Sequence, residues 1–178
     1  MKFDYERADR MREKMIPYDR VLKHISLGAN DTLIDVGAGS GEYAIRFAKL
    51  FPEASIIALD SEEDSIKLIR KKIDDAGLKN LYIKHADICH YDLTDDITQV
   101  FFSNSFHDLE CREEMMRKFS SRNALKVTLI EFKKGTMHGP PDYMRINPSD
   151  LESMFRSAGY RLADQDEFDS HYLHVYIK

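Results

Sequence analysis

Short apolar runs alternate along the chain with segments whose apolar residues recur every three or four positions. The runs predict strands at residues 32–34, 55–59, 81–83, 99–103 and 126–132. The segments between and after them predict helices at residues 42–50, 66–76, 108–119 and 148–158. Strands that alternate with helices are typical of βαβ units, so this part of the chain predicts a mostly parallel sheet with helices on its faces.

The last part of the chain breaks this alternation. Residues 160–168 and 170–177 predict two strands joined by a tight turn at Asp169. Strands so close together must be antiparallel, because a parallel pair needs a crossover of about a dozen or more residues. The predicted fold class is therefore α/β: a Rossmann-like three-layer sandwich whose mostly parallel, seven-stranded sheet ends in an antiparallel hairpin.

Two further helices are predicted before the first strand, at residues 5–16 and 18–25. We expect residues 1–27 to form an N-terminal helical cap on a single domain that covers residues 1–178. A chain of 178 residues is long enough to bury one independent core.

The composition is that of an ordinary globular protein, with 43% hydrophobic and 32% charged residues. The net charge of −5 disfavours duplex nucleic acid as the main partner. Residues 1–7 do not resemble a signal peptide, and no apolar run approaches the roughly 20 residues that cross a bilayer. Cys89 and Cys111 lack metal-ligand spacing and give no reason to expect a disulfide, which favours a reducing compartment. We therefore expect a cytoplasmic protein without a membrane partner.

A glycine-rich loop, Asp35-Val36-Gly37-Ala38-Gly39-Ser40-Gly41, follows the first predicted strand. A strand, a glycine turn and a helix in this order form a nucleotide-type binding loop, because glycine lets a ligand approach the backbone and the helix start attracts negative groups. The dinucleotide fingerprint requires Gly-x-Gly-x-x-Gly, whereas position 42 here is Glu42. Asp60 ends the second strand 23 positions after Gly37, about where an acid reaches the hydroxyl pair of a ribose.

Asp35, the loop glycines, Asp60 and Asp87 together resemble the motif series of class I S-adenosylmethionine-dependent methyltransferases. The resemblance implies the strand order 3-2-1-4-5-7-6 and S-adenosyl-L-methionine as the cofactor. It also implies that Asp60, with Ser61, binds the ribose and that Asp87 and Ile88 border the adenine. The remaining cofactor residues that it implies are Asp35, Gly37, Ala38, Gly39 and Gly41 at the methionine end, and Ser103 and Asn104 along the cofactor edge.

Two later segments are similar to ubiquinone/menaquinone-biosynthesis-type methyltransferases and their small relatives. One is the segment after the fourth strand, in which Asn104 is followed three positions later by His107. The other comprises residues 131–134, Gly139-Pro140-Pro141 and residues 145–148.

His107 is the candidate catalytic base, since an imidazole pKa of about 6.5 suits proton removal near neutral pH. The alternative is that its loop only orders the cofactor edge or caps a helix that begins at Asp108. Tyr18, Glu131 and Arg145 are the candidate residues of an acceptor pocket. A buried hydrogen bond between Glu131 and Arg145 is the structural alternative for that pair.

The other histidines do not predict a second site. His85 and His90 flank Asp87 without further ligands, so no metal is expected. His171 and His174 fall on opposite faces of the last strand, because their spacing is odd.

These observations predict an S-adenosylmethionine-dependent methyltransferase that acts on a small-molecule acceptor. A non-catalytic cofactor-binding or partner subunit stays open as an alternative, because function is carried by sites rather than by folds. The glycine spacing and the terminal hairpin disfavour a nicotinamide-dependent oxidoreductase. Nucleic acid is not an expected partner, and a homodimer is left open.

Overall fold

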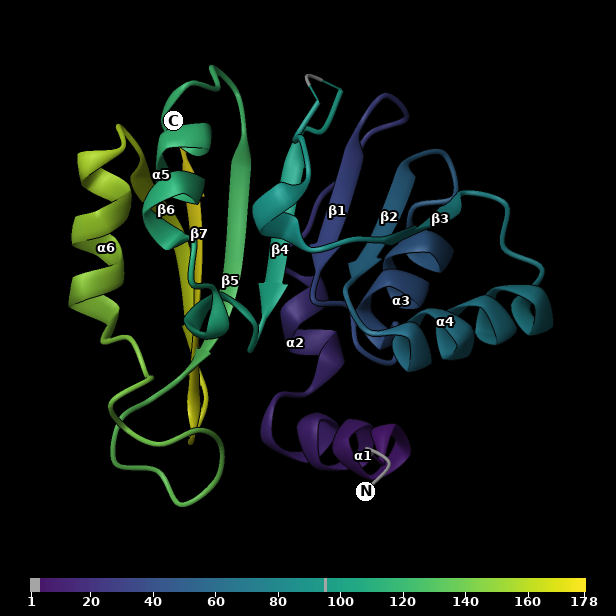
Figure 1. Cartoon of the computed structure of the whole chain (residues 1–178), viewed down its shortest axis with the longest axis horizontal. Helices are drawn as coiled ribbons and strands as arrows, with labels where there is room; N and C mark the ends of the chain where they lie inside the picture. Colours follow the sequence, from purple (N-terminus) through teal and green to yellow (C-terminus); the bar gives the residue numbers. More distant parts are fainter. Residues whose placement is uncertain (1–3, 95) are drawn as a thin grey trace.

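The computed structural model describes residues 4–94 and 96–178. Residues 1–3, at the start of the expected cap, and Asp95 lie outside the described residues. Within them, seven strands form one sheet in the order β3-β2-β1-β4-β5-β7-β6 (Figure 1). The strands are β1 (Thr32–Val36), β2 (Ser55–Asp60), β3 (Leu81–His85), β4 (Gln99–Ser103), β5 (Lys126–Phe132), β6 (Arg161–Glu167) and β7 (His171–Ile177). The predicted fold class and strand order are confirmed.

One strand of the sheet runs opposite to all the others. Strands β1 to β5 pair in parallel with one another, whereas β7 is antiparallel to both of its neighbours, β5 and β6. The start of β7 therefore lies at the carboxyl end of β5, where His171 is opposite Phe132. This places residues from the last strand at the edge of the sheet where open α/β sheets bind ligands.

Helices cover both faces of the sheet (Figure 1). They are α1 (Tyr5–Met15), α2 (Tyr18–Leu22), α3 (Glu42–Leu50), α4 (Glu63–Ala76), α5 (Arg112–Ser120) and α6 (Pro148–Ser157), with short 3-10 helices η1 (Ile88–His90) and η2 (Phe106–Asp108). Apolar residues of α2, α3 and α4 pack in one core cluster, and those of α5 and α6 pack in the other. The sheet thus has a buried layer on each side, as the predicted sandwich requires.

The helix predicted at residues 108–119 begins later than expected. The chain first forms η2, and α5 starts only at Arg112. The cause is a long-range contact, because the Glu131 carboxylate accepts hydrogen bonds from the backbone N–H groups of Phe106 and His107 at 3.0 and 3.1 Å. These contacts fix the chain in a tight turn before the helix can begin.

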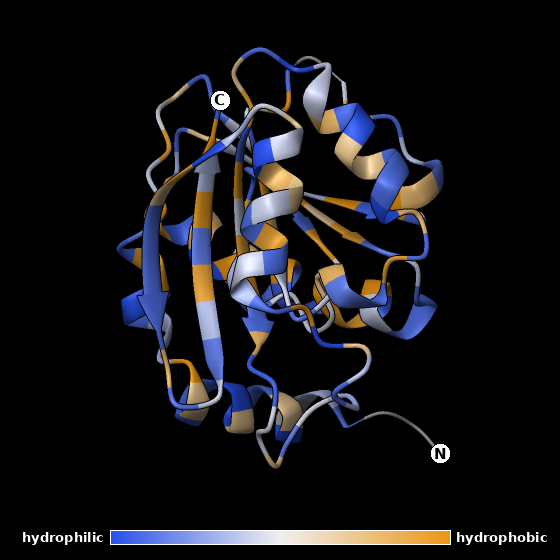
Figure 2. Cartoon of the chain, turned by 90° about the vertical axis from the view of Figure 1, so that its left-hand side faces the viewer, coloured by the Kyte–Doolittle hydropathy of each residue, from blue (hydrophilic) through white to orange (hydrophobic). Residues whose placement is uncertain are grey.

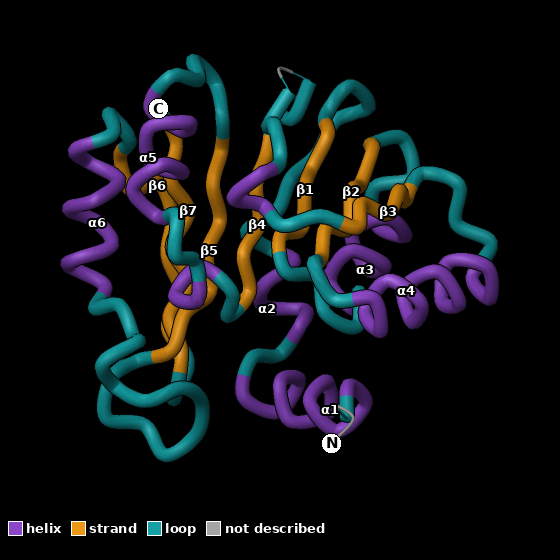
Figure 3. The backbone as a smooth tube through the Cα atoms, in the orientation of Figure 1, coloured by secondary structure: helices purple, strands orange, loops and turns teal. Residues whose placement is uncertain are grey.

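The two edges of the sheet are covered differently. Between β3 and β4 the described residues form η1 and loop but no α-helix (Figure 3). The opposite edge strand, β6, is mostly exposed and mostly hydrophilic, whereas β7 beside it is mostly buried (Figure 2). Charged edge strands resist pairing with other sheets, so β6 is protected by its own side chains.

Helix α1 lies below the carboxyl ends of the central strands (Figure 1). The Ser40 hydroxyl donates to the Asp9 carboxylate at 2.6 Å, and the hydroxyls of Tyr5 and Ser65 lie 2.8 Å apart. Two polar contacts therefore join α1 to the glycine loop and to α4. No helix built from the described residues has the length and apolar character needed to cross a membrane.

Candidate active site

The glycine loop leaves the sheet at the end of β1 and leads into α3. The N–H groups of Gly37 and Ala38 donate to the Leu59 carbonyl on the neighbouring strand, at 2.9 and 3.1 Å. Gly37 has a φ of +70°, and a Cβ at this position would lie 2.7 Å from the Cβ of Ser105. Glycine is therefore the residue that fits here, because any side chain would collide with the segment that follows β4.

The third glycine of the loop has a packing role in this structure. Gly41 has a φ of +76°, and an added Cβ would lie 2.8 Å from a side-chain carbon of Ile69 in α4. Its missing side chain lets the start of α3 approach α4 closely. This accounts for a glycine at 41 instead of at 42, where a dinucleotide loop would need one.

Asp60 fastens the loop to the end of β2. Its Oδ2 accepts a hydrogen bond from the Gly39 N–H at 2.7 Å, and its Oδ1 accepts one from the Glu62 N–H at 2.9 Å. Each carboxylate oxygen can accept more than one hydrogen bond. Asp60 therefore keeps acceptor capacity on both oxygens for the hydroxyl groups of a ligand.

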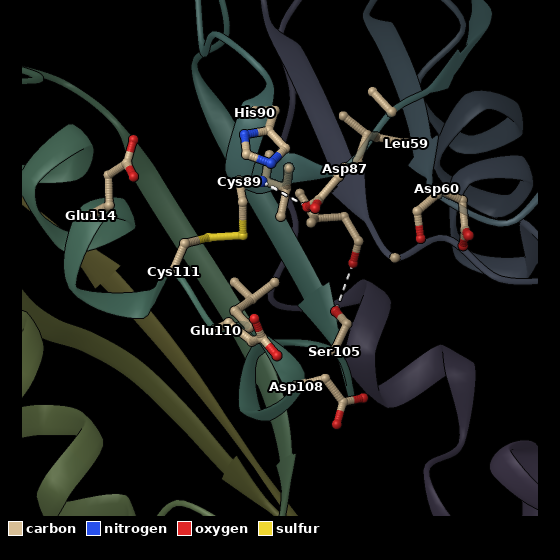
Figure 4. A pocket seen from close by; sticks show the side chains of 16 residues that line it. Leu59, Asp60, Asp87, Cys89, His90, Ser105, Asp108, Glu110, Cys111 and Glu114 are labelled. Atoms are coloured by element: carbon tan, nitrogen blue, oxygen red, sulfur yellow. Dashed lines mark hydrogen bonds between the residues drawn. A yellow bond between two sulfur atoms is a disulfide. The ribbon is translucent and has the colours of Figure 1, made fainter.

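A cavity of about 640 Å³ lies between the ends of β1, β2 and β3 and the segment after β4 (Figure 4). Its volume is within the usual range for small-molecule sites, roughly 300–1,000 Å³. The candidate cofactor residues that line it are Gly37, Asp60, Ser61, Asp87 and Ile88. The candidate cofactor residues that do not line it are Asp35, Ala38, Gly39, Gly41, Ser103 and Asn104.

The wall of the cavity that faces Asp60 includes residues that were not among the candidate site residues, although the segment after the fourth strand was expected at this edge. Ser105, Asp108 and the residues around Cys111 form this wall (Figure 4). The available signal was position, because residues that follow parallel strands gather at one edge of the sheet.

A disulfide joins Cys89 and Cys111 beside the cavity, so the expectation of unpaired cysteines is wrong. The Asp87 side chain accepts from the Cys89 N–H at 2.9 Å and starts η1, which brings this residue opposite the turn before α5. The Cα atoms of the two cysteines lie 5.7 Å apart, a usual separation for a disulfide. The pair ties two sides of the cavity together, and the argument from these cysteines for a reducing compartment loses its basis.

His107 and Glu131 form a buried pair near the same edge of the sheet. His107 Nδ1 lies 2.6 Å from Glu131 Oε2, while the other oxygen of Glu131 accepts the two backbone N–H groups of η2. Both side chains are almost fully buried. Glu131 therefore binds the backbone of the loop after β4 and the imidazole of His107, and the structure does not have the alternative hydrogen bond between Glu131 and Arg145.

The pair changes the proton affinity of His107. Burial disfavours the charged imidazole, but the hydrogen bond and the charge of Glu131 outweigh it and raise the pKa of His107 above its usual value. With Nδ1 held by Glu131, the other ring nitrogen, Nε2, lies 3.4 Å from the Asp108 carboxylate that borders the cavity. Nε2 is therefore the atom through which this histidine can exchange a proton.

Arg145 holds together the loop that follows β5. Its guanidinium donates to the backbone carbonyls of Lys133, Thr136, His138 and Pro140, at distances from 2.7 to 3.1 Å. These bonds occupy all three nitrogens of the side chain. Arg145 therefore fixes the course of this loop.

Asp35 and Asn104 lie at the ends of the adjacent strands β1 and β4, where Ser103 is the last residue of β4. Asp35 Oδ2 and Asn104 Oδ1 are buried and have no hydrogen-bond partner among the described residues. Burial raises the pKa of Asp35 to about 7. Asn104 has a φ of +57°, the only positive value for a non-glycine residue in the described part of the chain. Strained backbone of this kind concentrates at functional sites.

Two other residues near this edge, Arg12 and His171, were not candidates from the sequence. The positive charge of Arg12 in α1 opposes the effect of burial on Asp35, whose pKa is raised overall, and adds to the effect of burial on His171, whose pKa is lowered. Tyr18, a candidate pocket residue, is buried with its ring 5.0 Å from that of Tyr43. Across the described ranges, no group of three or more His, Cys, Asp or Glu side chains is placed to hold a metal ion.

The reversed seventh strand, the glycine loop and the acids at the ends of β2 and β3 define the class: this is the fold of class I S-adenosylmethionine-dependent methyltransferases. A family model described as a methyltransferase domain matches residues 27–140, and the chain belongs to this family. The predicted class of enzyme and its cofactor, S-adenosyl-L-methionine, are confirmed at the level of the family.

Solved structures share the whole fold with this chain. A SAM-dependent methyltransferase from Aquifex aeolicus superposes with a TM-score of 0.83 over 99% of both chains, at 20% sequence identity. Magnesium protoporphyrin IX methyltransferase from Synechocystis PCC 6803, solved with bound SAH, has a TM-score of 0.75 and 13% identity, and covers 100% of this chain and 89% of that one.

The similarity to curated proteins is more local. A tRNA (guanine-N(7)-)-methyltransferase from Lactiplantibacillus plantarum is 41% identical over 54 residues, which are 30% of this chain and 25% of that protein. The chain thus aligns with a quarter or less of the length of the curated relatives it matches.

Proposed function

We propose that this protein transfers a methyl group from S-adenosyl-L-methionine to a small-molecule acceptor. The observation that carries the proposal is the 640 Å³ cavity, which collects Gly37, Asp60, Ser61, Asp87 and Ile88 at the ligand-binding edge of the sheet. The unpartnered Asp35 Oδ2 and the spare acceptor capacity of Asp60 fit an ammonium group and a ribose, respectively.

In this proposal, Asp60 and Ser61 bind the ribose, and Asp87 and Ile88 border the adenine. Asp35, Ser103 and Asn104 lie toward the methionine end. The cofactor, when bound, supplies a methyl group that is already activated on a sulfonium. The residues of the chain then need only to orient the reactants and exclude water.

We propose His107 as the base for an acceptor that carries a proton on its reacting atom. Glu131 fixes the imidazole and holds a hydrogen at Nδ1, so Nε2 can receive the proton. Because Glu131 raises the pKa of His107, the imidazole holds its proton more strongly than an ordinary histidine does, and a higher pH favours the neutral, basic form.

The acceptor class has weaker support than the cofactor class. The magnesium protoporphyrin IX methyltransferase is an example of this fold serving a small molecule. For this chain we propose a single domain of residues 1–178 with residues 1–27 as its cap. The closer assignment to ubiquinone/menaquinone-type enzymes rests on residues 103–109 and 131–148 alone. A non-catalytic partner subunit is the competing reading, and it predicts cofactor binding without turnover.

Calorimetric titration with S-adenosylmethionine, S-adenosylhomocysteine and NAD tests the proposal. We expect both adenosyl compounds to bind and NAD not to bind. Asp60→Ala should weaken cofactor affinity about 100-fold, because hydrogen bonds to a charged group contribute about 1.5–3 kcal/mol each. Asp64→Ala, an exposed acid in the first turn of α4, is the matched control and should bind normally. Binding of NAD alone, or equal affinities for the two variants, would contradict the proposal.

The compartment and the assembly state are separate proposals. We propose the cytoplasm as the compartment, where the Cys89–Cys111 disulfide of the structure would have to be reduced, because this compartment keeps most cysteines as thiols. Alkylation of acid-quenched cells measures their state directly, and a fully oxidised pair would argue against this compartment. Sedimentation of the purified chain decides between a monomer and a homodimer.

A further inference from the structure

His171 has one polar atom that the protein leaves without a partner. The side chain is fully buried, and its Nδ1 lies 2.8 Å from the Ser170 hydroxyl. Its Nε2 makes no hydrogen bond to any described residue. Buried polar atoms are normally paired, so an orphaned nitrogen at the ligand-binding edge of a sheet indicates a contact with a ligand.

The place of His171 in the sheet separates it from the cofactor residues. Alternation along the strands and the register of β1, β4, β5 and β7 put Asp35 and His171 on the same face of the sheet. Their strands are three strand spacings apart, roughly 14 Å at about 4.8 Å each, and His171 is offset further along β7 from Val175, the position in register with Asp35. The cavity lies beside β1, β2 and β3, so His171 is on the opposite side of β4, where an acceptor would approach the methyl group.

The charged groups that face His171 are cations. The pKa of His171 is lowered to about 4, and burial is the largest cause. Further contributions come from Arg12, Arg145, His107 and Lys133. The ring is therefore neutral at physiological pH. Nδ1 lies at hydrogen-bond distance from the Ser170 hydroxyl, which can either donate or accept. In the tautomer in which Ser170 donates, the ring hydrogen is on Nε2, where it can be donated to a ligand oxygen.

Arg12 differs from two of the other cations near His171 in what its side chain contacts. Arg145 is bonded to the carbonyls of its loop, and Lys133 donates to the Phe168 carbonyl and pairs with Glu167. Arg12 pairs with Asp9 on its own helix, and about a quarter of its side chain is exposed. It can therefore turn toward a ligand without breaking a contact to the sheet.

We propose that His171 and Arg12 bind a carboxylate on the methyl acceptor, an inference that rests on the proposed function. The carboxylate accepts the Nε2 hydrogen of His171 and pairs with the Arg12 guanidinium. The sulfonium of a bound cofactor adds to the positive potential that holds such an acceptor. Because His171 is fully buried, α1 or the loop at residues 133–145 must move for the acceptor to enter.

The test uses the full chain with isotopically labelled histidine, saturated with S-adenosylhomocysteine. Benzoate and its neutral counterpart benzamide are the probes, followed by calorimetry and by the ring resonances of His171. We expect benzoate to bind at least tenfold more tightly than benzamide. A bound carboxylate should also shift the His171 resonances and raise the pKa of this ring.

Three variants separate binding from structure. His171→Gln and Arg12→Gln should each lower benzoate affinity about tenfold while S-adenosylhomocysteine affinity stays within twofold. His174→Gln is the matched control, because this histidine lies on the other face of β7 and bonds the Tyr176 hydroxyl. It should leave benzoate affinity unchanged.

The possible failures are distinguishable. Equal binding of the two probes, no benzoate binding to the loaded protein, or benzoate binding without a change at His171 would overturn the inference. Loss of cofactor affinity in Arg12→Gln would place Arg12 on the cofactor instead and overturn its role here. If the wild-type chain binds no S-adenosylhomocysteine, the proposed function itself fails.

Discussion

The cavity and the buried edge near His171 differ in how fully the protein satisfies its own polar groups. Around the cavity, Asp60 accepts two backbone N–H groups and Asp87 accepts one. Along the other part of the edge, Asp35 Oδ2, Asn104 Oδ1 and His171 Nε2 are buried without a partner. The first region is held in place by the chain's own hydrogen bonds, whereas the second keeps buried polar atoms that the described residues leave unpaired.

Glu131 lies between the two regions, and removing it should have the largest effect. Glu131→Ala leaves two backbone N–H groups and the buried His107 without their acceptor, so we expect a loss of about 3–5 kcal/mol in the free energy of unfolding. Urea unfolding measures it, with the exposed Glu53→Ala as the control, for which a change within about 0.5 kcal/mol is expected. A loss below about 1 kcal/mol for Glu131→Ala would mean that this buried pair does not hold the turn.

The disulfide beside the cavity tests how much this region contributes to the stability of the fold. Cys89 and Cys111 close a loop with a sequence separation of 22. The chain-entropy model gives about 3 kcal/mol for a loop of this length. Cys111→Ser should therefore be about 3 kcal/mol less stable than the oxidised protein by urea unfolding. Adding dithiothreitol should bring the wild-type chain down to the level of the variant, and a reductant-independent difference would assign the effect to packing.

In the region with unpaired polar atoms, replacing Asp35 should change the free energy of unfolding by a smaller amount that depends on pH. The pKa of Asp35 is about 7 in the folded chain, whereas its ordinary value is 3.8. Between these two pH values, the folded state keeps a proton on Asp35 that the unfolded state has lost. Stability from this group is complete below pH 3.8 and is lost as the pH rises to about 7. Asp35→Asn removes this dependence. The free energy of unfolding of Asp35→Asn should rise relative to that of the wild type by about 1.4 kcal/mol for each pH unit between pH 5 and pH 7.

Urea unfolding of the ligand-free protein at pH 5, 6 and 7 measures this gain. Asp169→Asn, in the exposed hairpin turn, should show no such trend. A constant difference between Asp35→Asn and the wild type at all three pH values would mean that Asp35 is charged in the folded state.

Features that depend on local patterns were predictable from the sequence. The bounds of α3, β4 and β5 follow directly from apolar periodicity. Asp60 and Asp87 could be placed at the cavity because each comes at or just after the end of a parallel strand. Such positions need only the strand assignments and the rule that carboxyl ends share one edge.

Features that depend on long-range contacts were not predictable. The late start of α5 is set by Glu131, 24 residues beyond His107. The Cys89–Cys111 bond needs the three-dimensional course of two connections, and His171 reaches the site only because β7 is inserted between β5 and β6. No periodicity in a single segment contains that information.

The insertion of β7 also orders events during synthesis on a ribosome. The segments that build the cavity end near Glu114, whereas His171 is added 57 residues later. At roughly 5–20 residues per second, this is a delay of about 3–11 seconds. Because β6 reaches the sheet only through β7, the nascent chain exposes the outer side of β5 from the synthesis of Phe132 until β7 is added. The cavity can therefore form before the His171 edge exists, and β5 is the strand most exposed to chaperones and to mispairing while the chain is completed.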